Sequence, residues 1–165
     1  MVRPWRRRSP MGEMELLAEY VARTYPQDLV MMRVRLGTVT TEVDLSGLPE
    51  RSRGIVQVMA RWADAVIVRP HELVVLEAGM RSDTGDVSKL QIYGSLVPLT
   101  AELRPYLDRP TVLELVVAIE DPVVTAWAEA AGIRVRLYKP AWLAEWSAKR
   151  NRRESRAPHH GGLLP

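Results

Sequence analysis

Apolar residues recur along the chain with two different periods, and these periods predict the first elements of secondary structure. In the segment 14–24 they recur at the three- and four-residue spacing of an amphipathic helix, which the pair Tyr25-Pro26 closes. In the segment 30–36 apolar and polar residues alternate up to Gly37, a pattern typical of a strand. The chain therefore begins with a helix followed by a strand.

The middle of the chain predicts a β-hairpin. After the loop-like segment 38–54, residues 55–59 fit either a short strand or one helical turn. Two runs rich in β-branched residues then follow, at 64–68 and 73–77, and only four residues separate them. This spacing favours antiparallel pairing of the two runs.

The second half of the chain alternates helices with strands. Asp86 is a candidate N-cap for one helix, and Asp121-Pro122 has the residue types of a helix start. A nearly continuous apolar run between these helices is typical of a strand that is covered on both faces. The predicted elements are a helix, a strand, a helix, a strand and a last amphipathic helix at 86–101, 111–119, 121–131, 133–137 and 140–148.

Together these elements predict an α/β fold with a mixed central sheet flanked by helices. Their order is a core of αβββαβ followed by a C-terminal αβα extension, in which the hairpin requires antiparallel pairing and the later crossovers favour parallel pairing. The length of 165 residues fits one domain. We place this domain at 13–148, between a basic N-terminal arm at 1–12 and a basic, disordered C-terminal tail at 149–165.

Composition excludes several classes of protein and site. Hydrophobic residues make up 47% of the chain and charged residues 26%, as in folded globular proteins. No apolar run has the ~20 residues of a membrane span, and no secretory signal is visible, so we expect a soluble protein of the cytoplasm. The absence of cysteine excludes disulfides and thiolate metal sites. Carboxylates remain as the main candidate metal ligands.

The positive charge is concentrated at the two ends. The net charge is +3, but the first ten residues hold four arginines and the segment 149–156 holds five basic residues against one Glu. Such arms can hold a nucleic-acid backbone, or they can be solvated tails. The candidate DNA-binding residues of the arms are Arg6, Arg7, Arg8, Arg150, Arg152 and Arg153.

Two carboxylates stand at one end of the predicted hairpin. Asp64 begins its first strand and Glu77 ends its second, so the two acidic groups lie at the same end of the sheet. Two such groups repel each other unless a proton or a cation lies between them. Oxygen ligands in this position suit Mg²⁺ or Mn²⁺, which can activate water for phosphodiester hydrolysis.

Three stretches around these carboxylates resemble the PD-(D/E)XK nuclease superfamily, in particular its RecB-like and phage-exonuclease branch. They are Arg61-Trp-Ala-Asp64-Ala-Val, Glu77-Ala-Gly79-Met, and Gly85-Asp86 with Lys89-Leu-Gln-Ile-Tyr93. The resemblance covers about residues 13–120. It implies a metal-dependent nuclease with Asp64 and Glu77 as metal ligands, the carbonyl of Ala78 as a candidate third ligand, and Tyr93 near the DNA.

The sequence departs from the family pattern at the lysine. Gly79 stands where the family has the lysine of Glu-x-Lys, and Lys89 stands where it has the glutamine of the helical motif. Either the Lys89 ammonium returns to the site as the catalytic charge, or Lys89 is a surface residue that pairs with Asp86. Arg81 is a further candidate for this charge.

The first helix offers one more carboxylate. In the resembling families such a group often completes the site, and Glu19 is the better placed of two candidates, although a charged outer face is the simpler interpretation. The function predicted from the sequence is a nuclease that uses Mg²⁺ or Mn²⁺ to hydrolyse DNA. The alternative is an inactive nuclease fold that serves as a DNA-binding or assembly component of a phage or mobile-element complex. The partners we expect are DNA and either a second copy of the chain in a homo-oligomer or a larger nucleoprotein or virion assembly.

Overall fold

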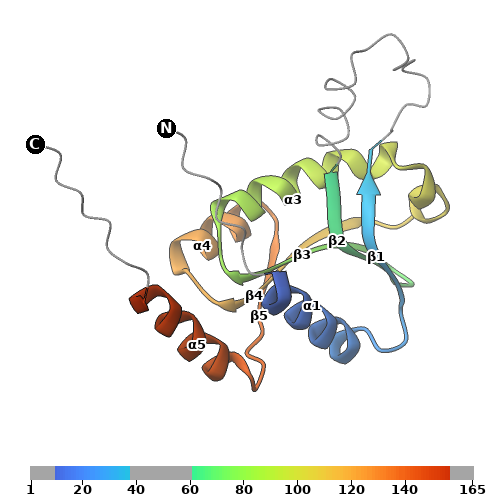
Figure 1. Cartoon of the computed structure of the whole chain (residues 1–165). Coiled ribbons are helices and arrows are strands. Elements are labelled where there is room, and N and C mark those ends of the chain that lie inside the picture. Colours follow the sequence, from blue (N-terminus) through green and yellow to red (C-terminus); the bar gives the residue numbers. More distant parts are fainter. Residues whose placement is uncertain (1–9, 38–60, 157–165) are drawn as a thin grey trace, which may run out of the picture.

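The computed structural model describes residues 10–37 and 61–156, which form a five-stranded mixed sheet flanked by helices (Figure 1). The strands stand in the order β1-β2-β3-β4-β5. The pairs β1·β2 and β2·β3 are antiparallel, whereas the pairs β3·β4 and β4·β5 are parallel. The α/β class, the hairpin and the mixed sheet are confirmed. The strands are β1 (Leu29–Leu36), β2 (Arg61–Val68), β3 (Leu73–Arg81), β4 (Thr111–Ile119) and β5 (Arg134–Leu137).

Helices cover both faces of the sheet. One core layer lies between the sheet and helices α3 (Thr84–Leu96) and α4 (Pro122–Ala130), and the short 3-10 helices η2 (Val97–Leu99) and η3 (Ala101–Tyr106) extend it. The other layer lies between the sheet and helices α1 (Pro10–Thr24) and α5 (Leu143–Arg156). Figure 1 shows α3 and α1 on opposite sides of the strands.

Strands β3 and β4 are the centre of the sheet. In β3 every residue except the last is buried, and the middle of β4 is equally enclosed. Coverage on both faces explains why these strands are apolar runs rather than alternating sequences. The acidic residue Glu77 therefore lies inside one of the most enclosed strands of the protein.

Helix α3 begins earlier than the sequence predicts. Its N-cap is Asp83, whose carboxylate accepts a hydrogen bond of 2.6 Å from the Gly85 N–H, so the prediction of Asp86 as N-cap is wrong. The helix also ends at Leu96, where the 3-10 turn that contains Pro98 begins, instead of continuing to residue 101. The predicted cap Asp121 of α4 is confirmed, since its carboxylate accepts from two N–H groups of the first turn.

The ends of the domain differ from the predicted arms. Helix α1 already begins at Pro10, inside the predicted arm, and α5 continues through Arg156, so residues 149–156 are helical rather than disordered. Arg6, Arg7, Arg8, the segment 55–59 and the residues after 156 lie outside the described ranges. Within residues 10–37 and 61–156, no helix is both long enough and apolar enough to cross a bilayer.

Candidate functional site

Strands β2 and β3 separate at the point where the two predicted carboxylates stand. The ladder between them covers only residues 65–68 of β2 and 73–76 of β3. Directly beyond it, the backbone N–H of Ala78 donates a hydrogen bond of 2.9 Å to Asp64 Oδ2. The Asp64 carboxylate thus accepts a hydrogen bond that a backbone oxygen of β2 would accept if the ladder continued. This bond fixes the carboxylate against β3.

A local distortion of β1 and β2 accompanies this opening. On each of these strands, two side chains three residues apart pack into the same core layer, one before and one after Arg33 or Asp64. A regular strand would direct residues at this odd spacing to opposite faces. The four side chains are Met31 and Val34 on β1, and Ala63 and Val66 on β2. Among the described residues, Arg33 alone combines a side chain with a positive φ, of 52°. Such a conformation costs about 1–2 kcal/mol in a residue with a side chain.

Helix α3 brings a cation to the carboxylates. Lys89 Nζ lies 2.8 Å from Glu77 Oε1 and 3.0 Å from Asp86 Oδ1. Asp86 and Lys89 are three residues apart on one helical face, so the buried Asp86 carboxylate anchors the ammonium while the long lysine stem reaches β3. Lys89 therefore pairs with Asp86, as one interpretation expects, and its ammonium also reaches Glu77, as the other expects.

Burial dominates the electrostatics of the two carboxylates. Desolvation, followed by repulsion from Asp64, raises the pKa of Glu77 to about 7 despite the opposing ion pair with Lys89. Desolvation also raises the pKa of Asp64, against the hydrogen bond from Ala78 and the charges of Lys89 and Arg33. Near neutral pH the two carboxylates therefore favour a bound proton or a cation that offsets their charge.

The lysine pKa moves in the direction that keeps its charge. Although burial opposes it, the contacts with Glu77 and Asp86 raise the pKa of Lys89. Lys89 and Glu77 are partners in one hydrogen bond, and the pKa of each is raised for a different reason. Burial and Asp64 outweigh Lys89 for the glutamate, whereas two acidic partners outweigh burial for the lysine.

Asp86 occupies the space in front of Gly79. A Cβ at this glycine would lie 3.1 Å from Asp86 Oδ2 and 3.1 Å from the backbone oxygen of Arg81, closer than side chains normally approach. A side chain at this position would force the Asp86 carboxylate or the backbone of β3 to shift by a few tenths of an ångström. Gly79 is thus coupled to the aspartate that anchors Lys89.

Tyr93 is a structural contact of the site. Its side chain is buried, and its hydroxyl donates a hydrogen bond of 2.8 Å to the backbone oxygen of Trp62. Burial, and next the negative charge of Glu77, raise the pKa of Tyr93 to about 12. The side chain joins α3 to β2, and the expectation that Tyr93 lies near DNA stays a prediction.

The structure does not bring Glu19 to the carboxylate pair. Its carboxylate accepts hydrogen bonds of 2.8 Å from the Tyr138 hydroxyl and 3.0 Å from Trp142 Nε1. These contacts lie on the α1 and α5 face of the sheet, whereas Lys89 belongs to the α3 face. Glu19 therefore joins α1 to the segment between β5 and α5 instead of completing a metal site.

The remaining predicted contacts are spread over the surface. Arg81 ends β3 with an exposed side chain. On α5, Arg150 lies over the Trp146 ring at 5.5 Å from its centroid, and Arg152 Nε donates to the Ala148 oxygen at 3.3 Å. The side chain of Arg153 lies outside the described part of the chain. Helix α5 and the carboxylate pair stand on opposite faces of the sheet.

Two residues of the site were not predicted as site residues. Asp86 appeared only as a cap or surface partner, because its burial against Gly79 depends on how α3 packs. Arg33 carried no signal, because its left-handed backbone is invisible in a strand that alternates regularly in sequence. The i, i+3 spacing of Asp86 and Lys89 was the one sequence feature that pointed toward the pair.

The carboxylates fit a small hard cation in part. Glu77 Oε2 is buried and has no hydrogen-bond partner, so one oxygen remains for a ligand. Asp64 lies on the neighbouring strand and carries the second carboxylate. Among the described residues, however, no three His, Cys, Asp or Glu side chains are arranged to hold a metal ion. Any cation at this place would take its other ligands from backbone oxygens, water or substrate, as Mg²⁺ commonly does.

No protein-family model, no curated protein and no solved structure matches the chain.

Proposed function

We propose that the protein is a divalent-metal-dependent nuclease of PD-(D/E)XK type that hydrolyses phosphodiester bonds in DNA. The observation that carries this proposal is the buried, unpartnered Oε2 of Glu77, which lies beside Asp64 and whose other oxygen contacts the Lys89 ammonium. A protein that used Glu77 only for its fold would leave one buried carboxylate oxygen without a hydrogen-bond donor, which is costly.

Each residue of the site has a role in this proposal. Asp64 and Glu77 would hold Mg²⁺ or Mn²⁺, and the hydrogen bond from Ala78 keeps Asp64 oriented. A bound ion supplies a water of lowered pKa and a positive charge beside the scissile phosphate. Lys89, held by Asp86, offers a fixed ammonium to the charge that develops on the phosphate oxygens. The lysine of α3 thereby replaces the lysine that β3 lacks.

The test is cleavage of plasmid DNA and of a labelled single strand with Mg²⁺ or Mn²⁺. Asp64→Asn and Glu77→Gln should abolish cutting and weaken Mn²⁺ binding. Lys89→Met should reduce the cleavage rate by about 10²–10³-fold, the usual loss for one electrostatic group, while it leaves Mn²⁺ bound. Lys139→Met, at an exposed lysine on the chain after β5, is the matched control and should cut like the parent. Cutting by Asp64→Asn, or cutting in EDTA, would contradict the proposal.

One observation favours the alternative of an inactive nuclease fold that binds DNA or serves in an assembly. Gly79 is sterically committed to Asp86, and the described residues lack a three-ligand cluster. In this alternative Lys89 only neutralises two buried carboxylates. The parent protein would then bind DNA without cutting it under any of the metal conditions, and Lys89→Met would lower stability without any change in catalysis.

A further inference from the structure

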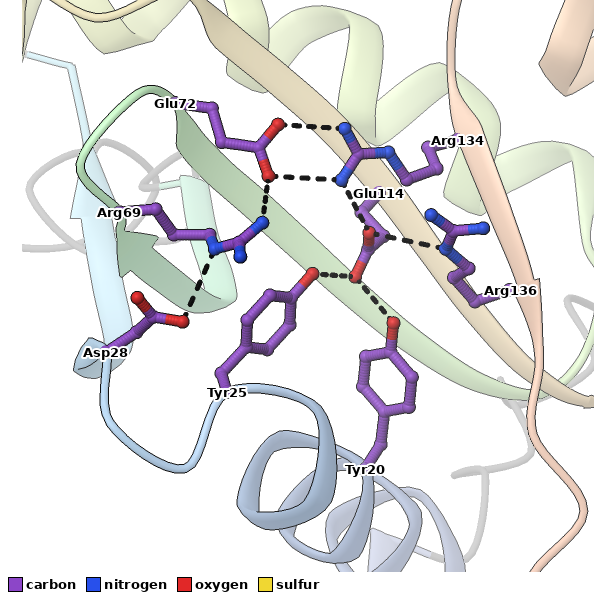
Figure 2. Close-up of polar contacts among 8 residues, drawn as sticks. All are labelled: Tyr20, Tyr25, Asp28, Arg69, Glu72, Glu114, Arg134 and Arg136. Carbon is purple, nitrogen blue, oxygen red and sulfur yellow. Dashed lines mark hydrogen bonds and ion pairs between the residues drawn. The ribbon is translucent and has the colours of Figure 1, made fainter.

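A second cluster of charged residues lies on the α1 face of the sheet, opposite the face on which α3 carries Lys89 (Figure 2). The cluster extends from Arg69 and Glu72 at the β2–β3 turn to Glu114 and Arg134, which stand level with Leu76 of β3 in the sheet register. Its centre is Glu114, a carboxylate with 0% exposure on the α1 face of β4. The nuclease proposal makes no use of this cluster.

Glu114 is fixed from several sides. Its Oε1 accepts hydrogen bonds of 2.9 Å from the Tyr20 hydroxyl and 2.7 Å from the Tyr25 hydroxyl, while Oε2 accepts from Arg134 Nη1 at 3.3 Å. Arg134 stands directly opposite Glu114 in the register of β4 and β5. Because β5 alternates, Arg134 and Arg136 project from the same strand face, and Arg136 Nε lies 3.8 Å from Glu114 Oε2.

A second carboxylate holds the arginines in place. Glu72 accepts from Arg134 at both oxygens, at 3.3 and 2.9 Å, and from Arg69 Nη1 at 2.7 Å. These hydrogen bonds, those from Arg134 first, lower the pKa of Glu72 to about 2, so it stays ionised at neutral pH. Asp28 lies 3.3 Å from Arg69 Nε. Three guanidinium groups are thus positioned before any ligand arrives.

These groups surround a hollow of about 530 Å³. Its wall carries three guanidiniums, one carboxylate and the imidazole of His71, so the wall is net positive. Arg136 is 52% exposed, and among the described residues its terminal nitrogens have no hydrogen-bond partner, so both remain free for a ligand. The volume lies within the range of small-molecule sites. The lining residues are Arg69, Pro70, His71, Glu72, Arg134 and Arg136.

We infer that this hollow binds a phosphoryl group, with the Arg136 guanidinium as its principal donor and Arg134, Arg69 and His71 around it. The planar fork of arginine matches the oxygens of phosphate, and charge-assisted bonds of this kind are about twice as strong as neutral ones. Carboxylates behind the wall fix Arg69 and Arg134, which reduces the entropy lost on binding. The phosphoryl group belongs either to a small phosphate ester or to a nucleic-acid backbone.

The test measures binding in EDTA at constant ionic strength, which excludes metal-mediated binding at the other site. The probes are inorganic phosphate, adenosine monophosphate and an oligothymidylate without terminal phosphates. Arg136→Gln should raise the dissociation constant of the probe that binds by about tenfold, the loss of a single strong contact. Arg104→Gln, at an exposed arginine of η3 on the other face, removes the same charge and should change this dissociation constant less than about twofold.

Each outcome decides the inference. Arg136-dependent binding of phosphate and adenosine monophosphate alone supports a small phosphate ester, and Arg136-dependent binding of the oligothymidylate supports a nucleic-acid backbone. Equal losses in the two variants, or no saturable binding of any probe, would overturn it. If Arg136→Gln does not fold, amide NMR shifts of the parent decide instead. They must fall on residues 69–72 and 134–136, and shifts centred on Glu77 would overturn the inference.

Discussion

Raising the pH should destabilise the metal-free protein, because Glu77 must give up its proton inside the sheet. Its pKa is about 7 in the folded protein against an ordinary value of 4.5. Between these values the folded state holds a proton that the unfolded state has lost. The stabilisation is therefore complete below pH 4.5 and is lost as the pH rises through 7.

The size of the effect follows from the shift. One pKa unit corresponds to about 1.4 kcal/mol, so the rise from 4.5 to about 7 predicts a loss of about 3 kcal/mol in the free energy of unfolding by about pH 8.5. Asp64 acts with the same sign, since burial raises its pKa as well. A loss of this size is a large fraction of the stability of a typical domain.

Urea unfolding in EDTA, followed by circular dichroism from about pH 5 to about pH 8.5, measures this loss. Glu77→Gln keeps the shape of the side chain but cannot titrate, so its stability should change much less over the same range. Glu102→Gln, at an exposed glutamate of η3, should follow the parent. An equally steep decline in Glu77→Gln would refute the assignment of the effect to this carboxyl group. Mg²⁺ or Mn²⁺ should restore stability most strongly at the alkaline end, where the carboxylates are ionised.

Three further substitutions test the surroundings of the site. Gly79→Ala should lower the free energy of unfolding by about 1–3 kcal/mol because its Cβ would crowd Asp86, and an unchanged urea midpoint would contradict this packing. Tyr93→Phe leaves the Trp62 carbonyl without its donor and should cost about 1–3 kcal/mol in thermal or urea unfolding; a neutral result would mean that water replaces the hydroxyl. Arg33→Gly should add about 1 kcal/mol of stability, since glycine adopts a positive φ freely, and it should raise the Asp64 pKa measured by carboxyl NMR. A destabilised Arg33→Gly protein would show that the guanidinium contributes more than the backbone strain costs.

The sequence predicted those parts of the fold that depend on local patterns. The β-branched runs around Asp64 and Glu77 became the β2–β3 hairpin, and Asp121-Pro122 began α4 as its residue types require. The start of α3 was misplaced because Asp83 and Asp86 are both acceptable caps, and only packing selects between them. The helical content of residues 149–156 was missed because a run of basic residues resembles a solvated tail.

The candidate site was predictable in its residue types but not in its connections. The positions of Asp64, Glu77 and Lys89 follow from strand order and helix spacing. That Lys89 reaches Glu77, and that Asp86 crowds a side chain at position 79, depends on how closely α3 approaches the sheet. Glu19 was misassigned because helical spacing gives the face of α1 but not the aromatic partners that the loop before α5 brings to that face.

The left-handed residue of β1 also affects how the sheet ends. Strand β1 is the outermost strand in the sheet order, and it exposes Leu29 and Met32. An outer strand with apolar side chains is a template on which another polypeptide can add a strand and begin aggregation. At Arg33 the backbone leaves the extended conformation, so an incoming strand would meet a regular row of donors and acceptors over only three or four residues on either side. Among residues 10–37 and 61–156 no strand pairs with this side of β1, and the distortion beside Asp64 therefore also protects it from self-association.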